Sequence, residues 1–60
     1  MNEDSIRLAA KATYYCCLLD GEVDLETFNL NLSEVLEGAS VDYSDDDLDA
    51  ILQYAESEWF

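Results

Sequence analysis

Apolar residues recur at helical spacing in three runs, and Gly21 and Gly38 follow the first and second of them. The first run covers about residues 4–19 and is apolar on two sides. One face contains Ile6, Ala10, Thr13 and Cys17. The second, nearly opposite face contains Leu8, Ala12, Tyr15 and Leu19. Such a helix is either the central helix of the fold or lends one face to a partner, which here would make a homodimer.

The second run, DLETFNLNLSEVLEG, fits two structures. Helical spacing places five apolar residues on one stripe: Leu25, Phe28, Leu32, Val35 and Leu36. Asp24 is then a candidate N-cap and Gly38 a candidate C-cap. The part FNLNL alternates as a half-buried strand would, so a short strand or hairpin around residues 23–32 is the alternative. The helix accounts for more apolar positions, and it predicts that Leu30 points outward between Glu26 and Glu37.

The third run begins at an acidic stretch, VDYSDDDLDA. Ser44 followed by Asp47 fits a capping box, and Asp45, Asp46 and Asp47 occupy the first turn, where the helix dipole favours negative charge. The buried stripe contains Leu48, Ile51, Leu52, Ala55 and Trp59. The three runs predict an all-α, compact three-helix domain over residues 1–60. Its expected core is Ile6, Cys17, Phe28, Leu32, Leu36, Leu48, Leu52 and Trp59.

Charge restricts the partners that the chain can bind. Fifteen acids face only Arg7 and Lys11, which gives a net charge of −13, while half of the residues are hydrophobic. This balance argues against binding of nucleic acid or an anionic membrane and favours a basic protein surface. No stretch approaches the ~20 apolar residues of a membrane span. The acidic start lacks the features of a secretory signal, and adjacent Cys16 and Cys17 are typical of reduced thiols, so we expect a cytoplasmic protein.

No motif predicts catalysis, a metal or a cofactor. The chain has no histidine and only one pair of cysteines, so a structural zinc site lacks ligands. The string LDGEVDLETF resembles the end of an EF-hand loop, but Cys16 and Leu18 would fall where oxygen ligands are required. The same string is similar to the helix–turn–helix of TerB-type domains, which implies an acidic turn between two helices. A fold of this size hardly encloses a substrate between two carboxylates, and we expect no enzyme.

Capping explains some of the acids in the third run but not all. Asp49, Glu56 and Glu58 lie beyond the first turn, and on a helical wheel Asp45, Asp49 and Glu56 line one flank of the apolar stripe. An ordinary solvated face mixes both signs of charge, whereas no basic residue follows Lys11. Gathered on half the surface, the thirteen acids from Asp20 onward would approach the charge density of duplex DNA.

In size, acidity and lack of a catalytic signature, the chain resembles small phage-encoded inhibitors that mimic nucleic acid, including many anti-CRISPR proteins. The resemblance implies a stoichiometric inhibitor that occupies the basic nucleic-acid-binding surface of a target such as a CRISPR-Cas effector complex, in the cytoplasm of a bacterial or phage-infected host. The acids expected to contact the partner are Asp42, Asp45, Asp46, Asp47, Asp49, Glu56, Glu58, Glu26, Glu34 and Glu37. Two alternatives remain open. One is a small helical adaptor or dimerisation module that binds through Tyr15, Leu30, Trp59 and Phe60. The other is a protein of a salt-loving organism, in which the charge says nothing of function.

Overall fold

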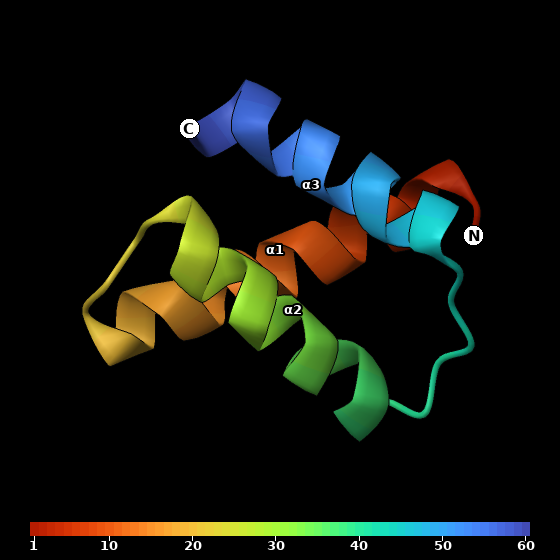
Figure 1. Cartoon of the computed structure of the whole chain (residues 1–60), viewed down its shortest axis with the longest axis horizontal. Helices are drawn as coiled ribbons and strands as arrows, with labels where there is room; N and C mark the ends of the chain where they lie inside the picture. Colours follow the sequence, from red (N-terminus) through yellow and green to blue (C-terminus); the bar gives the residue numbers. More distant parts are fainter.

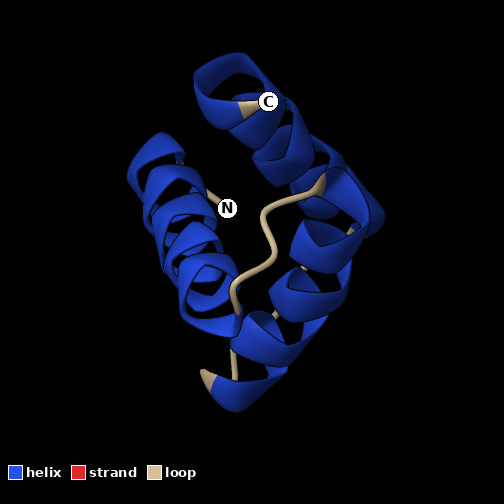
Figure 2. Cartoon of the chain, turned by 90° about the vertical axis from the view of Figure 1, so that its left-hand side faces the viewer, coloured by secondary structure: helices blue, strands red, loops and turns tan.

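Three helices follow one another in the computed structural model, which describes residues 1–60: α1 (Glu3–Asp20), α2 (Leu25–Gly38) and α3 (Asp45–Trp59). Figure 1 shows α2 crossing in front of α1, and α3 lying above α2 in the view. The all-α, three-helix prediction is confirmed. Residues 23–32, where a strand was the alternative, form the α1–α2 turn and the first half of α2, and everything outside the helices is loop (Figure 2). No helix has the length and apolarity that crossing a membrane requires.

Polar side chains set the junction between α1 and α2. Gly21 ends α1 in the left-handed region, at φ +82°, and its N–H donates to the Leu18 carbonyl at 3.2 Å. Asp24 then begins α2, because its carboxylate accepts a hydrogen bond from the Thr27 N–H at 2.7 Å. The acidic turn that the sequence predicts between the two helices is therefore confirmed.

The capping box at α3 is also confirmed. Ser44 Oγ accepts a hydrogen bond from the Asp47 N–H at 3.3 Å, and the Asp47 carboxylate accepts one from the Ser44 N–H at 3.1 Å. Two backbone donors that a helix start would leave unpaired are thus satisfied. At the start of α1, Asn2 has the equivalent role and accepts from the Ser5 N–H at 2.8 Å.

The prediction that Gly38 caps α2 is wrong. Gly38 is the last helical residue, and it is Ser40, at φ +56°, that adopts the left-handed conformation. The Ser40 N–H donates to the Glu37 carbonyl and the Val41 N–H to the Leu36 carbonyl, which is the Schellman arrangement. The helix runs further than the glycine suggests because this ending brings Val41 back beside Leu36.

The core lies where α2 and α3 both pack against α1. These two helices make little contact with each other, so α1 connects the fold. Eight residues are buried: Ala10, Thr13, Cys17, Phe28, Leu32, Leu36, Ile51 and Ala55. Four of the predicted core residues are among them, and the other four, Ile6, Leu48, Leu52 and Trp59, are half-buried against this cluster. The one buried polar side chain, that of Thr13, donates to the Ala9 carbonyl at 2.7 Å.

Aromatic rings join the end of α3 to α1. Trp59 stacks on Tyr14 with the ring centroids 4.3 Å apart and the planes 8° from parallel. Phe60 meets Tyr14 and Phe28 edge to face, and Tyr54 meets Trp59 in the same way. Trp59 and Phe60 were expected in one alternative to form an apolar patch for a partner. Trp59 packs largely within the chain, whereas Phe60 is 45% exposed.

Candidate functional site

An acidic row runs along α3. Asp45, Asp49 and Glu56 lie on one flank of the helix, beside the stripe that packs on α1, and all three side chains are exposed. The helical rise places Asp45 and Asp49 about 6 Å apart along the axis, and Asp49 and Glu56 about 10 Å apart. The two ion pairs of the chain involve other acids, so the row carries three uncompensated charges.

Asp47 differs from its neighbours Asp45 and Asp46, which are exposed. Its carboxylate accepts the Ser44 N–H and also lies 3.2 Å from the N-terminal ammonium group of Met1. The Ser44 N–H, and after it the ammonium group, stabilise the charged form and lower the pKa of Asp47 from its ordinary value. Asp47 was expected to contact a partner, but its contacts are those of a cap and of a link between the N-terminus and α3.

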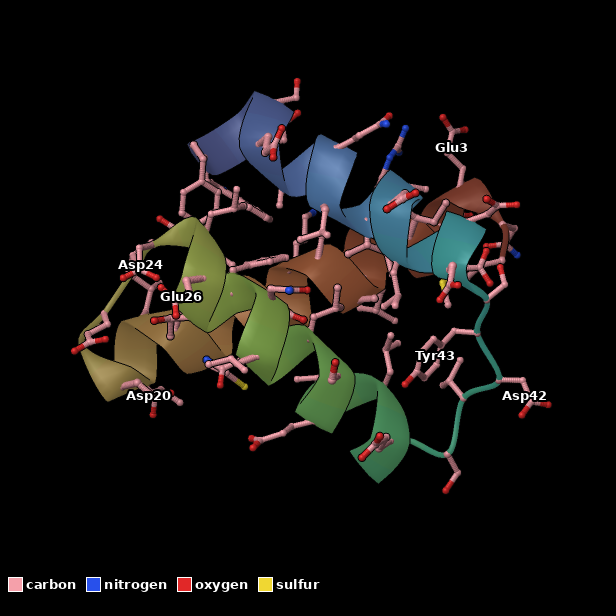
Figure 3. The ribbon with its side chains drawn as sticks, in the orientation of Figure 1. Glu3, Asp20, Asp24, Glu26, Asp42 and Tyr43 are labelled. Atoms are coloured by element: carbon pink, nitrogen blue, oxygen red, sulfur yellow. The ribbon has the colours of Figure 1, made fainter.

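The remaining predicted acids are exposed and lie outside the acidic row. Asp42 lies in the α2–α3 loop, Glu58 near the end of α3, and the other three, Glu26, Glu34 and Glu37, on α2. Figure 3 shows Asp20, Asp24 and Glu26 at one end of the molecule and Asp42 at the other. Acids after residue 19 therefore lie at both ends of the molecule.

Most of the negative charge has no counter-charge nearby. Glu3 lies 3.8 Å from the guanidinium group of Arg7, and Asp47 pairs with the Met1 ammonium group. The other 13 of the 15 acids have no cationic group within 4.0 Å. Exposed ion pairs contribute little to stability, but uncompensated charges attract a basic partner from a distance.

A second exposed surface is apolar. The face of α1 opposite the core contains Leu8, Ala12, Tyr15 and Leu19, and we call it the α1 seam. Leu8, Tyr15 and Leu19 are 71, 67 and 80% exposed, because α2 and α3 pack on the other face of α1 and its flanks. Although α1 is the central helix, its second face remains uncovered. Leu30, predicted to point outward from α2, is 66% exposed.

An apolar groove of about 310 Å³ adjoins the α1 seam. Leu8 and Ala12 form part of its wall on α1, and the opposite wall includes Val35 on α2 and Ala39 directly after it. Eight of its nine lining residues are hydrophobic. The sequence contains no signal for this groove, because the groove depends on the angle at which α1 and α2 cross, and no local pattern specifies that angle.

The titratable groups near the α1–α2 contact have structural roles. Cys17 is buried and Cys16 half-buried, and both thiols are free. The Asn31 amide donates to Cys17 Sγ at 3.4 Å and to an Asp20 carboxylate oxygen at 3.3 Å, which ties α2 to α1. No group of three or more histidine, cysteine, aspartate or glutamate side chains is placed to hold a metal ion.

Two surfaces thus stand out, an acidic one on α2, α3 and the loops, and an apolar one on α1. The chain could fold without either of them, since a solvated surface usually mixes both signs of charge and exposes large apolar side chains singly. The chain matches no family model, no curated protein and no solved structure.

Proposed function

We propose that the chain is a stoichiometric inhibitor that occupies a basic nucleic-acid-binding surface of another protein in place of DNA or RNA. The observation that carries the proposal is the set of 13 acids without a cationic group within 4.0 Å. A partner whose lysines and arginines normally meet phosphates supplies the missing counter-charges. A CRISPR-Cas effector complex is one assembly that has such a surface.

The acidic row on α3 supports contact at a defined place. Its spacings of about 6 and 10 Å along the helix resemble those of phosphates along a nucleic-acid strand. Both Asp45 and Asp49 project from a helix whose other flank is fixed against α1, so their positions are set by the fold. A rigid row of charges loses less conformational entropy on binding than a disordered acidic tail does.

Charge density limits how far the mimicry extends. The accessible surface of 4062 Å² divided among 15 acids gives roughly 270 Å² for each. Duplex DNA carries one charge per ~1.7 Å of its axis, or one per roughly 110 Å² on a cylinder of its radius. The whole surface is therefore less densely charged than DNA, and the acids follow one another most closely between residues 42 and 49, where there are five aspartates.

The first prediction tests the row by removing its charges. Proteins that the immobilised chain captures from a bacterial lysate are expected to elute with increasing salt and to be displaced by duplex DNA. The triple variant Asp45→Asn, Asp49→Asn and Glu56→Gln keeps the shape of the side chains. Its affinity for the captured protein should fall roughly 3- to 150-fold at low salt, since each of the three exposed ion pairs contributes about 0.2–1 kcal/mol. The loss should shrink as salt screens the contact.

A matched variant on α2 separates the row from the net charge. Replacing Glu26, Glu34 and Glu37 with glutamine removes the same three charges from another exposed helix. If binding uses the row, this variant should lose clearly less affinity. Equal losses of affinity in the two variants would mean that binding depends on net charge alone. The proposed function would be contradicted if the α3 variant bound with unchanged affinity. It would also be contradicted if DNA did not displace the captured proteins. Circular dichroism should show that both variants fold.

A further inference from the structure

The α1 seam has the spacing of a coiled-coil contact. Its residues follow one another at intervals of four, three and four, which is the alternation of a and d positions in a heptad. The core face of α1, which contains Ile6, Ala10, Thr13 and Cys17, has the same intervals and is covered by other helices. The core face of α1 lies on its other side and is already occupied by α2 and α3. The pattern of the α1 seam therefore indicates that another helix covers it.

The α1 seam is also the part of the surface that a second copy can approach most easily. Residues 5–19 are the longest stretch without an acid, and they contain the only basic side chains of the chain, Arg7 and Lys11. Two copies with a net charge of −13 each repel one another, and pairing through α2 or α3 would bring their acids together. Contact through α1 keeps most of the acids of the two copies apart.

We propose that two copies of the chain associate through their α1 seams as an antiparallel, two-fold symmetric pair. In the register that places a against d positions, Leu8 faces Leu19 of the second copy. Ala12 faces Tyr15 of the second copy, so that a large side chain meets a small one. A two-fold axis repeats each contact, as an isologous interface requires. Lys11 lies beside Leu18 of the second copy, and the two Lys11 residues are about 7.5 Å apart along the axis.

Parallel pairing of the same surfaces fits less well. It would place Tyr15 on Tyr15 and Ala12 on Ala12 of the second copy, which crowds one layer and leaves a gap in the next. It would also align the two helix dipoles, which antiparallel pairing opposes. The groove beside Ala12 adds room for the antiparallel arrangement, because the Tyr15 ring of the second copy lies above its α1 wall.

The exposed area agrees with a weak or moderate dimer. An extended leucine or tyrosine side chain presents about 150–200 Å². Multiplied by the exposed fractions of Leu8, Tyr15 and Leu19, and by that of Leu18, which is 50%, this area gives roughly 400–500 Å² of exposed apolar surface. The largest apolar patch on a typical monomer covers about 300–600 Å² and is often functional, so the α1 seam lies within that range. Its area is also about half or more of the ~800 Å² that each partner buries in a standard interface.

The second prediction is a change of oligomeric state at the α1 seam. In sedimentation experiments the wild-type chain at high micromolar concentration should have a mass near twice its 6.8 kDa. Leu8→Glu should yield the monomer, because it places a charge opposite Leu19 of the second copy. The fold should survive, since Leu8 is 71% exposed, and circular dichroism checks this. Leu19→Glu, at the other end of the same contact, should behave alike.

Leu30→Glu is the matched control. Leu30 is a leucine of similar exposure, 66%, but it lies on α2 and outside the α1 seam. This variant adds the same charge and should remain a dimer. The proposal is overturned if the wild type is monomeric at high micromolar concentration in 0.5 M salt, if Leu8→Glu remains a dimer, or if Leu30→Glu dissociates the dimer as completely.

Salt separates this proposal from the proposed inhibitor function. Screening weakens the repulsion between two acidic copies, so the dimer fraction at a fixed concentration should rise between 0.05 and 0.5 M salt. Binding to a basic partner should weaken over the same range. A monomeric chain that still binds basic proteins would overturn only the dimer, and a dimer without affinity for basic proteins would overturn only the inhibitor function.

Discussion

At the residue scale, the backbone conformation requires a glycine at Gly21 but not at Gly38. Gly21 has a φ of +82°, which a residue with a Cβ adopts only with strain, whereas Gly38 is helical and a Cβ there would meet nothing within 4 Å. Ser40 has the converse problem, since it occupies the left-handed position that glycine favours at the end of a helix. The best place for the second glycine is therefore two residues further along the chain.

The third prediction follows from these positions. Gly38→Ala should raise the free energy of unfolding by about 0.5–1 kcal/mol through better helix propensity, and Ser40→Gly by a similar amount through relief of the left-handed conformation. Each should raise the melting temperature by about 2–8 °C in a chain of this size. Gly21→Ala is the control and should lower the stability by about 1 kcal/mol. The same sign for both glycine substitutions would contradict the assigned helix ending.

Asp24 links the stability of α2 to pH. The Thr27 N–H, and after it the Thr27 side chain, stabilise the carboxylate and lower the pKa of Asp24 from its ordinary value. The unfolded chain therefore binds a proton at a higher pH than the folded one does. The stability that this cap contributes is present above the unfolded pKa of about 3.9 and is lost as the pH falls through the lower folded value.

The fourth prediction uses asparagine to remove this dependence. Asparagine caps helices about as well as aspartate does but does not titrate. Urea unfolding of Asp24→Asn at pH 7 and at about pH 2.5 should show a smaller loss on acidification than in the wild type. Asn2 caps α1 with the same geometry, so the reverse change Asn2→Asp should make the loss larger. An acid response that neither substitution alters would mean that capping charges do not determine it.

At the scale of elements, the end of α3 is held to α1 by aromatic stacking. Ile51 and Ala55 are buried further back along the helix, but at the last turn the contact is that of Trp59 with Tyr14. Aromatic pairs contribute about 0.5–1.5 kcal/mol beyond the area that they bury. In a domain whose core rarely supplies more than ~3–5 kcal/mol of net stability, such a contact is a large fraction of the total.

The fifth prediction compares two adjacent tyrosines. Tyr14→Ala should lower the free energy of unfolding by about 2 kcal/mol, because it removes the stacking partner of Trp59 and leaves a cavity. Tyr15→Ala, one position along the same helix, should change it by less than about 0.5 kcal/mol, since Tyr15 is 67% exposed. Urea unfolding at a low micromolar concentration, where self-association is negligible, measures both. Equal losses would show that the stacking does not hold α3.

At the scale of the whole molecule, local signals in the sequence predict the helices and their starts well. Asp24 and the pair Ser44 and Asp47 act within one turn of themselves, so their hydrogen bonds hardly depend on the rest of the chain. The same holds for the core stripe of α2, where helical spacing outweighed the alternation of FNLNL. A strand there would have had no partner strand with which to pair.

The features that the sequence does not predict depend on tertiary packing. The ending of α2 at Ser40 depends on the return of Val41 to Leu36, and the groove beside the α1 seam depends on the crossing of two helices. The distribution of the acids over both ends of the molecule depends on the path of the loops. The stacking of Tyr14 on Trp59 joins residues 45 positions apart, and no local sequence pattern at either residue predicts this contact.

The position of α1 between two helices that barely touch determines which parts of the chain are free to vary over evolution. A change on the core face of α1 disturbs both packing contacts at once, whereas a change on α2 or α3 disturbs one of them. If the opposite face of α1 binds a second copy, almost no position between Ser5 and Leu19 can drift. The outer faces of α2 and α3, by contrast, can exchange aspartate, glutamate and small polar residues with little penalty. Homologues of this chain should therefore be recognised by the sequence of their first helix, and by little more than charge in the other two.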